Sequence, residues 1–104
     1  MAQASHAYLI PAKSSPGNYL IIPKDHAEDP VDLPGEWWQS VRELLPQVPG
    51  LGVHYNLSFN VGKLAGQSVK RLHLWVIPRA AGRPASGKGF ARLLAEANGV
   101  TAQE

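Results

Sequence analysis

The chain has 104 residues, with 10 Lys and Arg against 8 Asp and Glu and a formal net charge of +2. A chain of this length forms one domain, which excludes a multi-domain enzyme. The small net charge argues against a surface dense in phosphate contacts, so no nucleic-acid partner is expected. Cys is absent. That absence excludes a disulfide framework, a thiolate zinc site and a cysteine nucleophile.

The apolar runs are short, and the run Tyr19 to Ile22 is typical of them. Neither a membrane span nor a secretory signal is therefore expected, and the expected location is the cytoplasm.

Pro and Gly divide the chain into segments as long as one strand or one helix. The β-branched run Tyr19 to Ile22 predicts a buried strand, and Ala7 to Ile10 is expected to pair with it as a hairpin. From Asp32 to Leu45, apolar residues recur at helical spacing. Asp32 is the expected N-cap of this helix, with Pro34 tolerated in its first turn. The apolar residues are Trp37, Trp38, Val41, Leu44 and Leu45.

Residues 52 to 61 alternate between apolar and polar side chains, which predicts a half-buried strand. A second long strand is predicted from Val69 to Ile77, antiparallel to the first and ended by Pro78. The apolar face of the first strand is Val53, Tyr55, Leu57, Phe59 and Val61.

A last helical pattern comprises Phe90, Leu93, Leu94 and Ala97. These elements predict an α+β fold: one antiparallel sheet with a packed helix and a short C-terminal helical segment. Residues 1–104 are expected to form this single domain.

Strand periodicity places Arg71, His73 and Trp75 on one face of the second long strand. Arginine suits a phosphate, histidine suits nucleophilic or proton-transfer chemistry, and tryptophan suits stacking on a flat ligand. The structural alternative is a packed, hydrogen-bonded histidine beside a surface pair of Arg and Trp.

Several stretches of the chain, taken together, carry a family resemblance. They are residues 60–62, 65–69, 72–74 and 76–79, the segment 15–26, and residues 32–34 at the opening of a helix. In these stretches the chain resembles the histidine triad (HIT) family over about residues 7–95. The resemblance implies a HIT-like fold.

The resemblance also implies a reaction. In this family the middle histidine of the triad attacks the α-phosphorus of a nucleotide derivative and forms a nucleotidyl-histidine intermediate. The nucleotide then passes to water, phosphate or another acceptor. His73 matches the nucleophile, and Asn60, Gln67 and Ser68 match supporting positions around the phosphate. The resemblance implies no metal and no cofactor. It does imply a homodimer in which the sheets of the two protomers join.

The chain departs from the family pattern at four positions. Arg71 and Trp75 replace the first and third histidines, Asn18 replaces the histidine of a Gly-His pair, and Ile10 stands where many members have a ribose-binding acid. Arg71 can contact phosphate but cannot shuttle a proton. Asn18 is expected to be a ligand-binding residue at the position of the histidine that it replaces. Trp75 would narrow the pocket or stack on a ligand. A general acid would have to come from another group.

The other histidines carry weaker expectations. His54 shares a strand face with Asn56, Ser58 and Asn60, and either a site role or a structural role is open to it. His26 is expected to be structural. His6 is expected in a frayed terminus.

Three functions remain open from the sequence. The first is a divergent nucleotidyl hydrolase or transferase acting through His73. The second is a catalytically impaired protein that binds a nucleotide or phosphorylated metabolite. The third is an enzyme repurposed for another small anionic substrate. The ligand expected in the first two cases is a small nucleotide or phosphorylated molecule, and in the third it is another phosphorylated or carboxylated small molecule. The apolar surface at Trp37, Trp38 and Trp75 fits a homodimer.

Overall fold

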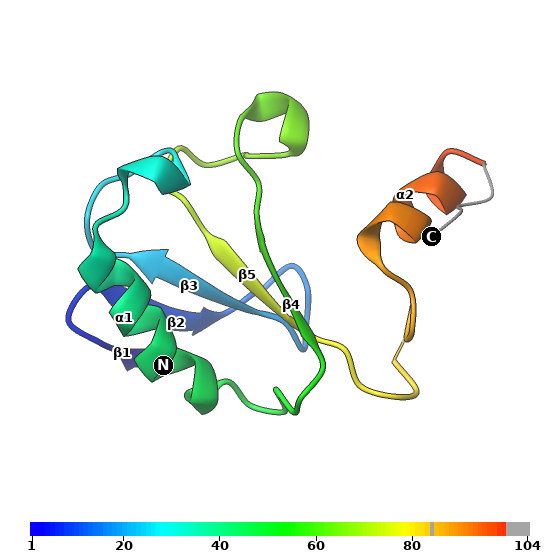
Figure 1. The fold of residues 1–104 in the computed structure, drawn as a ribbon, viewed down its shortest axis with the longest axis horizontal. Coiled ribbons are helices and arrows are strands. Elements are labelled where there is room, and N and C mark those ends of the chain that lie inside the picture. The colour runs from blue at the N-terminus through cyan, green and yellow to red at the C-terminus, as the bar shows by residue number, and fades with distance from the viewer. Residues whose placement is uncertain (84, 100–104) are drawn as a thin grey trace.

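The computed structural model describes residues 1–83 and 85–99, and it shows one antiparallel sheet with a helix lying against it (Figure 1). The sheet has five strands in the order β1-β2-β3-β5-β4. The α+β prediction is thereby confirmed. The strands are β1 (Ala2–Gln3), β2 (Ala7–Pro11), β3 (Tyr19–Pro23), β4 (Tyr55–Phe59) and β5 (Leu74–Pro78). The α-helices are α1 (Gly35–Leu44) and α2 (Phe90–Ala97), and the short 3-10 helices are η1 (Pro30–Asp32), η2 (Leu45–Gln47) and η3 (Lys63–Ala65).

The predicted hairpin and the predicted antiparallel pair are both present. β2 pairs with β3 so that Leu9 lies opposite Ile21. β4 pairs with β5 so that Leu57 lies opposite Val76. The crossover brings β5 between β3 and β4, which makes β5 a central strand.

Both long strands are shorter than predicted. The strand expected over residues 52–61 covers Tyr55–Phe59, because Gly52 has a positive φ of 62° and turns the chain before it. The strand expected from Val69 to Ile77 covers Leu74–Pro78. β3 pairs with β5 only from Leu74 to Val76, and the amide of Leu72 donates instead to the carbonyl of Ala27. An alternating pattern of side chains does not lengthen a β-strand where no partner strand is available for hydrogen bonding.

The prediction of Asp32 as the N-cap of the long helix is wrong. Asp32 ends η1, and the carboxylate that caps this short helix belongs to Asp29, which accepts from the amide of Val31 at 3.0 Å. α1 begins only at Gly35. Leu33 precedes Pro34, and a residue before proline is pushed from the helical region to the extended conformation that it adopts here.

The core lies between α1 and one face of the sheet, and Trp37 is its largest side chain. Trp37 is 0% exposed and meets Trp38 edge-on at a ring distance of 4.7 Å. Its indole N–H has no hydrogen-bond partner among the described residues. Around it are the buried side chains Ala7, Leu9, Ile21, Ala27, Leu33, Val41, Leu44, Val48, Leu72, Leu74 and Val76.

The expectation of a frayed terminus around His6 does not match its contacts. The amide of His6 donates to the buried hydroxyl of Ser40 on α1 at 3.0 Å, and its carbonyl accepts from the amide of Lys24 at 2.9 Å. Its ring lies 3.2 Å from the carboxylate of Asp25. These bonds tie the turn between β1 and β2 to the helix.

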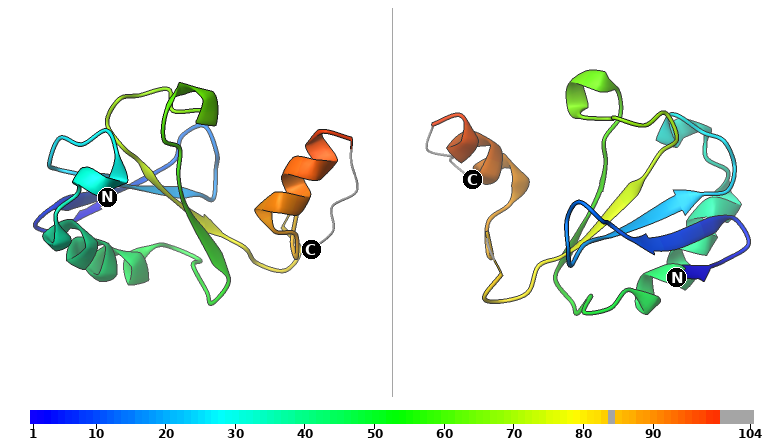
Figure 2. Two further views of the ribbon diagram at one scale, coloured as in Figure 1. Left: turned by 45° about the horizontal axis from the view of Figure 1, so that its top comes forward. Right: turned by 180° about the vertical axis from the view of Figure 1, so that it is seen from behind.

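α2 stands apart from the sheet, at the end of the segment that follows β5 (Figures 1 and 2). It buries no side chain. Lys88 and Arg92 pair with Glu96 at 2.9 and 3.4 Å. The hydrogen bond from Lys88, aided by the charges of Lys88 and Arg92, lowers the pKa of Glu96 below its ordinary value. Within the described part of the chain, no helix has the length and apolar character that crossing a membrane requires.

We expect Trp37→Ala to lower the free energy of unfolding by about 3–5 kcal/mol, because it empties the centre of the core. Trp37→Phe should cost roughly 1–3 kcal/mol, since the lost indole N–H had no partner to give up. Urea denaturation followed by circular dichroism measures both. Trp38→Ala is the matched control, because Trp38 is 44% exposed. A control that costs as much as Trp37→Ala would contradict the assignment of the core.

Candidate functional site

The sheet face opposite α1 carries a row of side chains that crosses four strands. Ile10 lies opposite Leu20, Leu20 opposite Trp75, and Trp75 opposite Ser58. All four are partly exposed, whereas Leu9, Ile21, Leu74 and Val76, which adjoin three of them along the strands, are buried in the core. This row is therefore the floor on which a ligand can lie.

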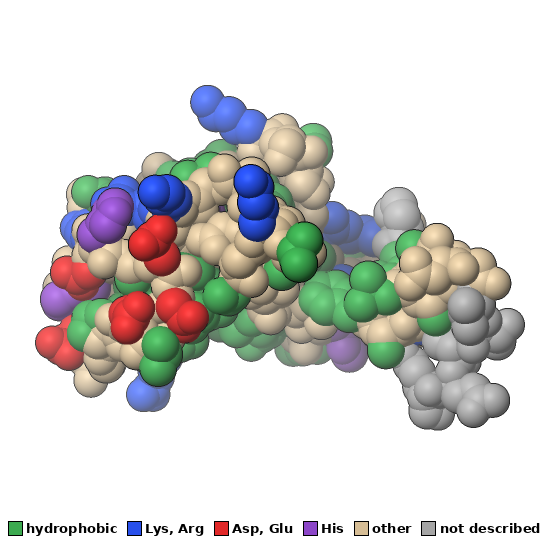
Figure 3. Space-filling model, turned by 90° about the horizontal axis from the view of Figure 1, so that it is seen from above, with side chains coloured by type: hydrophobic (Ala, Val, Ile, Leu, Met, Phe, Trp, Pro, Cys, Tyr) green, Lys and Arg blue, Asp and Glu red, His purple; other side chains and the backbone are tan. Residues whose placement is uncertain are grey.

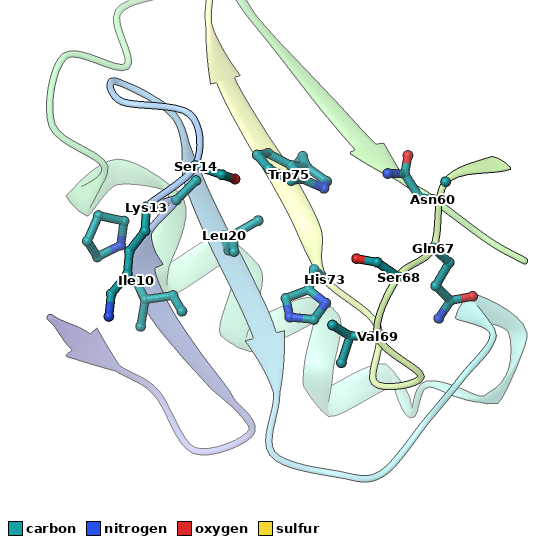
Figure 4. A pocket seen from close by; sticks show the side chains of 13 residues that line it. Ile10, Lys13, Ser14, Leu20, Asn60, Gln67, Ser68, Val69, His73 and Trp75 are labelled. Carbon is teal, nitrogen blue, oxygen red and sulfur yellow. The ribbon is translucent and has the colours of Figure 1, made fainter. Parts of the chain in front are cut away.

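A cavity of ≈ 390 Å³ opens above this floor (Figure 4). That volume is within the range of small-molecule sites, which span about 300–1,000 Å³. Its walls come from the β2–β3 turn on one side and from the 60–69 segment on the other. The lining residues are Ile10, Pro11, Ala12, Lys13, Ser14, Leu20, Asn60, Gly66, Gln67, Ser68, Val69, His73 and Trp75.

His73 immediately precedes β5 and lines the cavity. Leu72 and Leu74 on either side of it are buried in the core, and this alternation turns the imidazole to the opposite face. The ring is partly exposed and makes no hydrogen bond to another described residue. A ring nitrogen with a free lone pair is what nucleophilic attack requires.

The 60–69 segment supplies the polar wall beside His73. Figure 4 shows the Ser68 hydroxyl pointing toward the His73 ring, with Asn60 above it. Gly66 has a φ of +92°, and a Cβ at this position would lie 3.6 Å from the Asn60 amide nitrogen. That distance is an ordinary van der Waals contact, so the positive φ, and not a lack of space, favours glycine here.

Gln67 lies in the same wall but directs its amide into its own loop. Its Oε1 accepts from the amide of Gly62 at 2.8 Å, and its Nε2 donates to the carbonyl of Lys70 at 2.9 Å. The backbone amide of Gln67 also donates to the carbonyl of Gly62 at 3.1 Å. Gln67 thus holds the loop that presents Ser68.

Five of the predicted site residues line one cavity: His73, Trp75, Asn60, Gln67 and Ser68. Arg71 and Asn18 do not line it. The Arg71 guanidinium is directed to the carbonyl of Lys24 at 3.5 Å and not into the cavity. The ligand-binding roles of Arg71 and Asn18 remain predictions.

The side chain of Asn18 is occupied at the end of the hairpin. Its Nδ2 donates to the Ser15 hydroxyl at 2.7 Å, and its Oδ1 accepts from Arg83 at 3.3 Å. Arg83 also donates to the carbonyl of Pro78 at 2.5 Å. Asn18 therefore connects the β2–β3 turn to the segment after β5.

Several lining residues were not singled out from the sequence: Lys13, Ser14, Leu20 and Val69. Leu20 was predictable in principle, because the hairpin register puts it beside Ile10 on the face that α1 leaves open. Lys13 and Ser14 lie in the turn of the hairpin. Their place over the floor follows from the twist of the turn, which the residue pattern does not encode.

The remaining histidines lie outside this cavity. His54 lines a separate hollow of ≈ 570 Å³ with Arg79 and Lys88, and its carbonyl accepts from the amide of Arg79 at 2.7 Å. His26 is exposed. Over residues 1–83 and 85–99, no three His, Asp or Glu side chains gather as metal ligands would.

We expect Gln67→Ala to lower the free energy of unfolding by roughly 1–2 kcal/mol, because it removes both side-chain bonds that brace the loop. Hydrogen exchange of the Gly62 amide should accelerate at the same time. Ser68→Ala is the matched control, since it changes the next side chain in the same wall. Unchanged exchange at Gly62 in Gln67→Ala would contradict the bracing role.

Comparisons with known proteins agree with the fold. The HIT domain family model matches residues 6–82. The adenosine 5′-monophosphoramidase of Schizosaccharomyces pombe is 35% identical over 77 residues, covering 72% of this chain and 58% of that protein. An uncharacterized HIT-like protein of Methanocaldococcus jannaschii is 32% identical over 71 residues, covering 64% of this chain and 55% of that protein. The chain thus spans little more than half the length of these curated relatives.

Solved structures give the same result. The crystal structure of a HIT family protein from Bacillus anthracis superposes with a TM-score of 0.66 at 29% sequence identity, covering 86% of this chain and 67% of that one. The family match extends through the hairpin, α1, β4 and β5, and it includes every residue that lines the cavity. The chain belongs to the HIT domain family.

Proposed function

We propose that this protein binds a nucleotide and transfers its nucleotidyl group through His73, as a hydrolase or a transferase. The observation that carries the proposal is an imidazole without a hydrogen-bond partner among the described residues, on the floor of a cavity whose wall holds Ser68 and Asn60. The name of the Schizosaccharomyces pombe relative, an adenosine 5′-monophosphoramidase, supports this substrate class.

In the proposed first step, a ring nitrogen of His73 attacks the phosphorus of the substrate. A nitrogen–phosphorus bond forms as the bond to the leaving group breaks, and the leaving group departs with the electron pair. Ser68 and Asn60 can donate hydrogen bonds to the phosphate oxygens on which charge develops. In the second step water attacks the phosphorus, the bond to His73 breaks, and the water proton passes to solvent.

The step that lacks a partner is protonation of the leaving group. Trp75 is the next side chain of this face after His73, and its indole N–H is not acidic enough to protonate an amine. Asn18 is an amide already bonded to Ser15 and Arg83. General acid catalysis contributes about 10²- to 10⁴-fold. Substrates whose leaving groups need a proton should therefore react slowly.

The apolar floor of the cavity favours a second function, a binding protein without turnover. The floor of Ile10, Leu20 and Trp75 can hold a flat ligand by stacking whether or not the phosphorus reacts. A third function, an enzyme for another small anionic substrate, differs from the first in its ligand and not in its nucleophile. Detection of a covalent adduct on His73 separates the binding protein from the two enzymes.

We expect intact-mass spectrometry after rapid quench to show a nucleotidyl adduct that His73→Ala abolishes. Fluorogenic nucleotide esters with acidic leaving groups should turn over faster than alkyl phosphoramidates, because they leave without a proton. Trp75→His should raise the phosphoramidate rate by roughly tenfold or more, since an imidazolium can serve as the acid.

The matched control for that gain is Trp75→Phe, which removes the indole without supplying an acid. A rate increase in Trp75→Phe equal to that in Trp75→His would show that space in the cavity, not proton donation, limits the reaction. A well-folded protein that forms no adduct with any of these substrates would contradict the enzyme and leave the binding protein.

We also propose a homodimer that forms along β4, a strand at one edge of the sheet. Its side chains Tyr55 and Leu57 are 40% and 43% exposed, and Trp38 of the neighbouring helix is 44% exposed. Phe59 joins the two elements, because its ring lies 6.2 Å from that of Trp38. An uncovered edge strand flanked by apolar side chains favours pairing with a second copy.

Leu57→Glu should convert the dimer to a monomer, because it places a charge in the centre of this apolar edge. Sedimentation equilibrium at micromolar concentration measures the mass. Val31→Glu is the control, since Val31 is 83% exposed and lies outside β4. A wild-type protein of monomeric mass, or equal dissociation by both variants, would contradict an interface at β4.

A further inference from the structure

The cavity has a second polar end, which the nucleotidyl chemistry does not use. Lys13 and Ser14 line it from the β2–β3 turn, on the side opposite Asn60 and Gln67. Figure 4 shows the Lys13 side chain running beside Ile10, with the Ser14 hydroxyl nearer to Trp75. Between the two polar ends lies the apolar floor. A ligand that fills the cavity therefore meets polar groups at both of its ends.

The turn that carries Lys13 is held by backbone hydrogen bonds. The amide of Ala12 donates to the carbonyl of Asn18 at 3.0 Å, and the amide of Ser15 donates to the carbonyl of Ala12 at 3.1 Å. The amide of Asn18 closes the turn on the carbonyl of Ser15 at 3.1 Å. Ala12 is itself buried. The backbone of Lys13 is thus fixed at the rim, so that only its side chain has to be ordered by a ligand.

The Lys13 end of the cavity carries a positive charge that no lining acidic side chain neutralises. No Asp or Glu is among the residues that line the cavity, and Lys13 forms no ion pair with any described acidic residue. Acidic side chains are concentrated elsewhere: Asp25, Glu28, Asp29, Asp32 and Glu36 are all exposed. Figure 3 shows the acidic side chains of the viewed face gathered at the end of the molecule away from α2.

The side chains at the Lys13 end of the cavity suit an anion better than ligand hydroxyl groups. Ile10 and Leu20 offer no hydrogen-bond acceptor, and the ammonium of Lys13 only donates, which leaves the Ser14 hydroxyl to accept. A pair of ligand hydroxyls thus finds one side-chain acceptor among these four residues. An anion would instead gain the Lys13 ammonium and the Ser14 hydroxyl. Lysine is a common phosphate partner because it acts as a point charge.

We propose that the cavity selects a ligand with two phosphate groups, one against His73 and Ser68 and a second against Lys13 and Ser14. This inference rests on the proposed function, because the first phosphate is the one that His73 attacks. The second phosphate takes no part in the reaction. It contributes binding, and it favours ligands that present an anion at this end over ligands that present only neutral hydroxyls.

Isothermal titration calorimetry with AMP and adenosine 3′,5′-bisphosphate tests the proposal. In the wild-type protein the bisphosphate should bind roughly fivefold more tightly than AMP at low salt, the scale of a solvent-accessible ion pair. Lys13→Gln should remove this preference while leaving the affinity for AMP within about twofold. Raising the salt concentration should reduce the preference, because the pair is exposed.

The matched control is Lys63→Gln, since Lys63 is an exposed lysine that does not line the cavity. The preference for the bisphosphate should survive in this variant. The second phosphate site would be overturned if the wild-type protein bound both ligands with equal affinity. It would also be overturned if Lys13→Gln retained the preference for the bisphosphate, or if Lys63→Gln lost it. In those cases binding of AMP and an adduct on His73 would still uphold the proposed function. If neither ligand binds at millimolar concentration, both proposals fail.

Discussion

The site depends on the alternation of buried and exposed side chains from Leu72 to Val76. Leu72, Leu74 and Val76 are buried against α1, and each contributes about 1.5–3 kcal/mol by leaving water. A shift of one residue would bury the imidazole and the indole and expose these aliphatic groups. The orientation of His73 is therefore set by the hydrophobic core on the other side of the sheet. Few contacts within the cavity are needed to maintain it.

The two walls of the cavity come from distant parts of the chain and are built differently. The β2–β3 turn is a short hairpin connection closed by backbone hydrogen bonds. The 60–69 segment also has backbone hydrogen bonds, and the Gln67 side chain adds two more, to Gly62 and Lys70. A loop that takes part of its hydrogen bonding from a side chain loses those bonds when that side chain changes. The polar wall beside His73 is thus sensitive to substitution at Gln67.

Much of the fold was predictable, because its elements carry patterns of the expected period. The hairpin, the antiparallel pair that contains β4 and β5, and α2 all follow from such patterns. The strand ends were not predictable in the same way. Residues before Leu74 continue the alternation, yet β3 offers them no partner. Whether a ladder continues is decided by the neighbouring strand, which lies far away in the sequence.

The candidate site shows the same division. His73, Trp75 and the polar residues 60, 67 and 68 were predicted, and they line one cavity. Arg71 was expected beside them because the alternation includes it, but its guanidinium is directed to the carbonyl of Lys24. Lys13 was overlooked, because a turn residue carries no periodic pattern. The alternation thus predicted His73 and Trp75, and the family resemblance predicted residues 60, 67 and 68, whereas neither indicated Lys13.

The way in which α2 is attached has a consequence for how the protein responds to temperature. Arg79 holds the segment before α2 through the Asn56 side chain and the carbonyls of Ala85 and Lys88, while no side chain of the helix is buried. Detachment of α2 would expose little apolar surface, so its heat-capacity change would be small. The sheet and α1 would unfold with the large heat-capacity change of a hydrophobic core. The two ends of this short chain therefore obey different stability curves: the free energy of the core passes through a maximum with temperature, whereas that of α2 changes almost linearly.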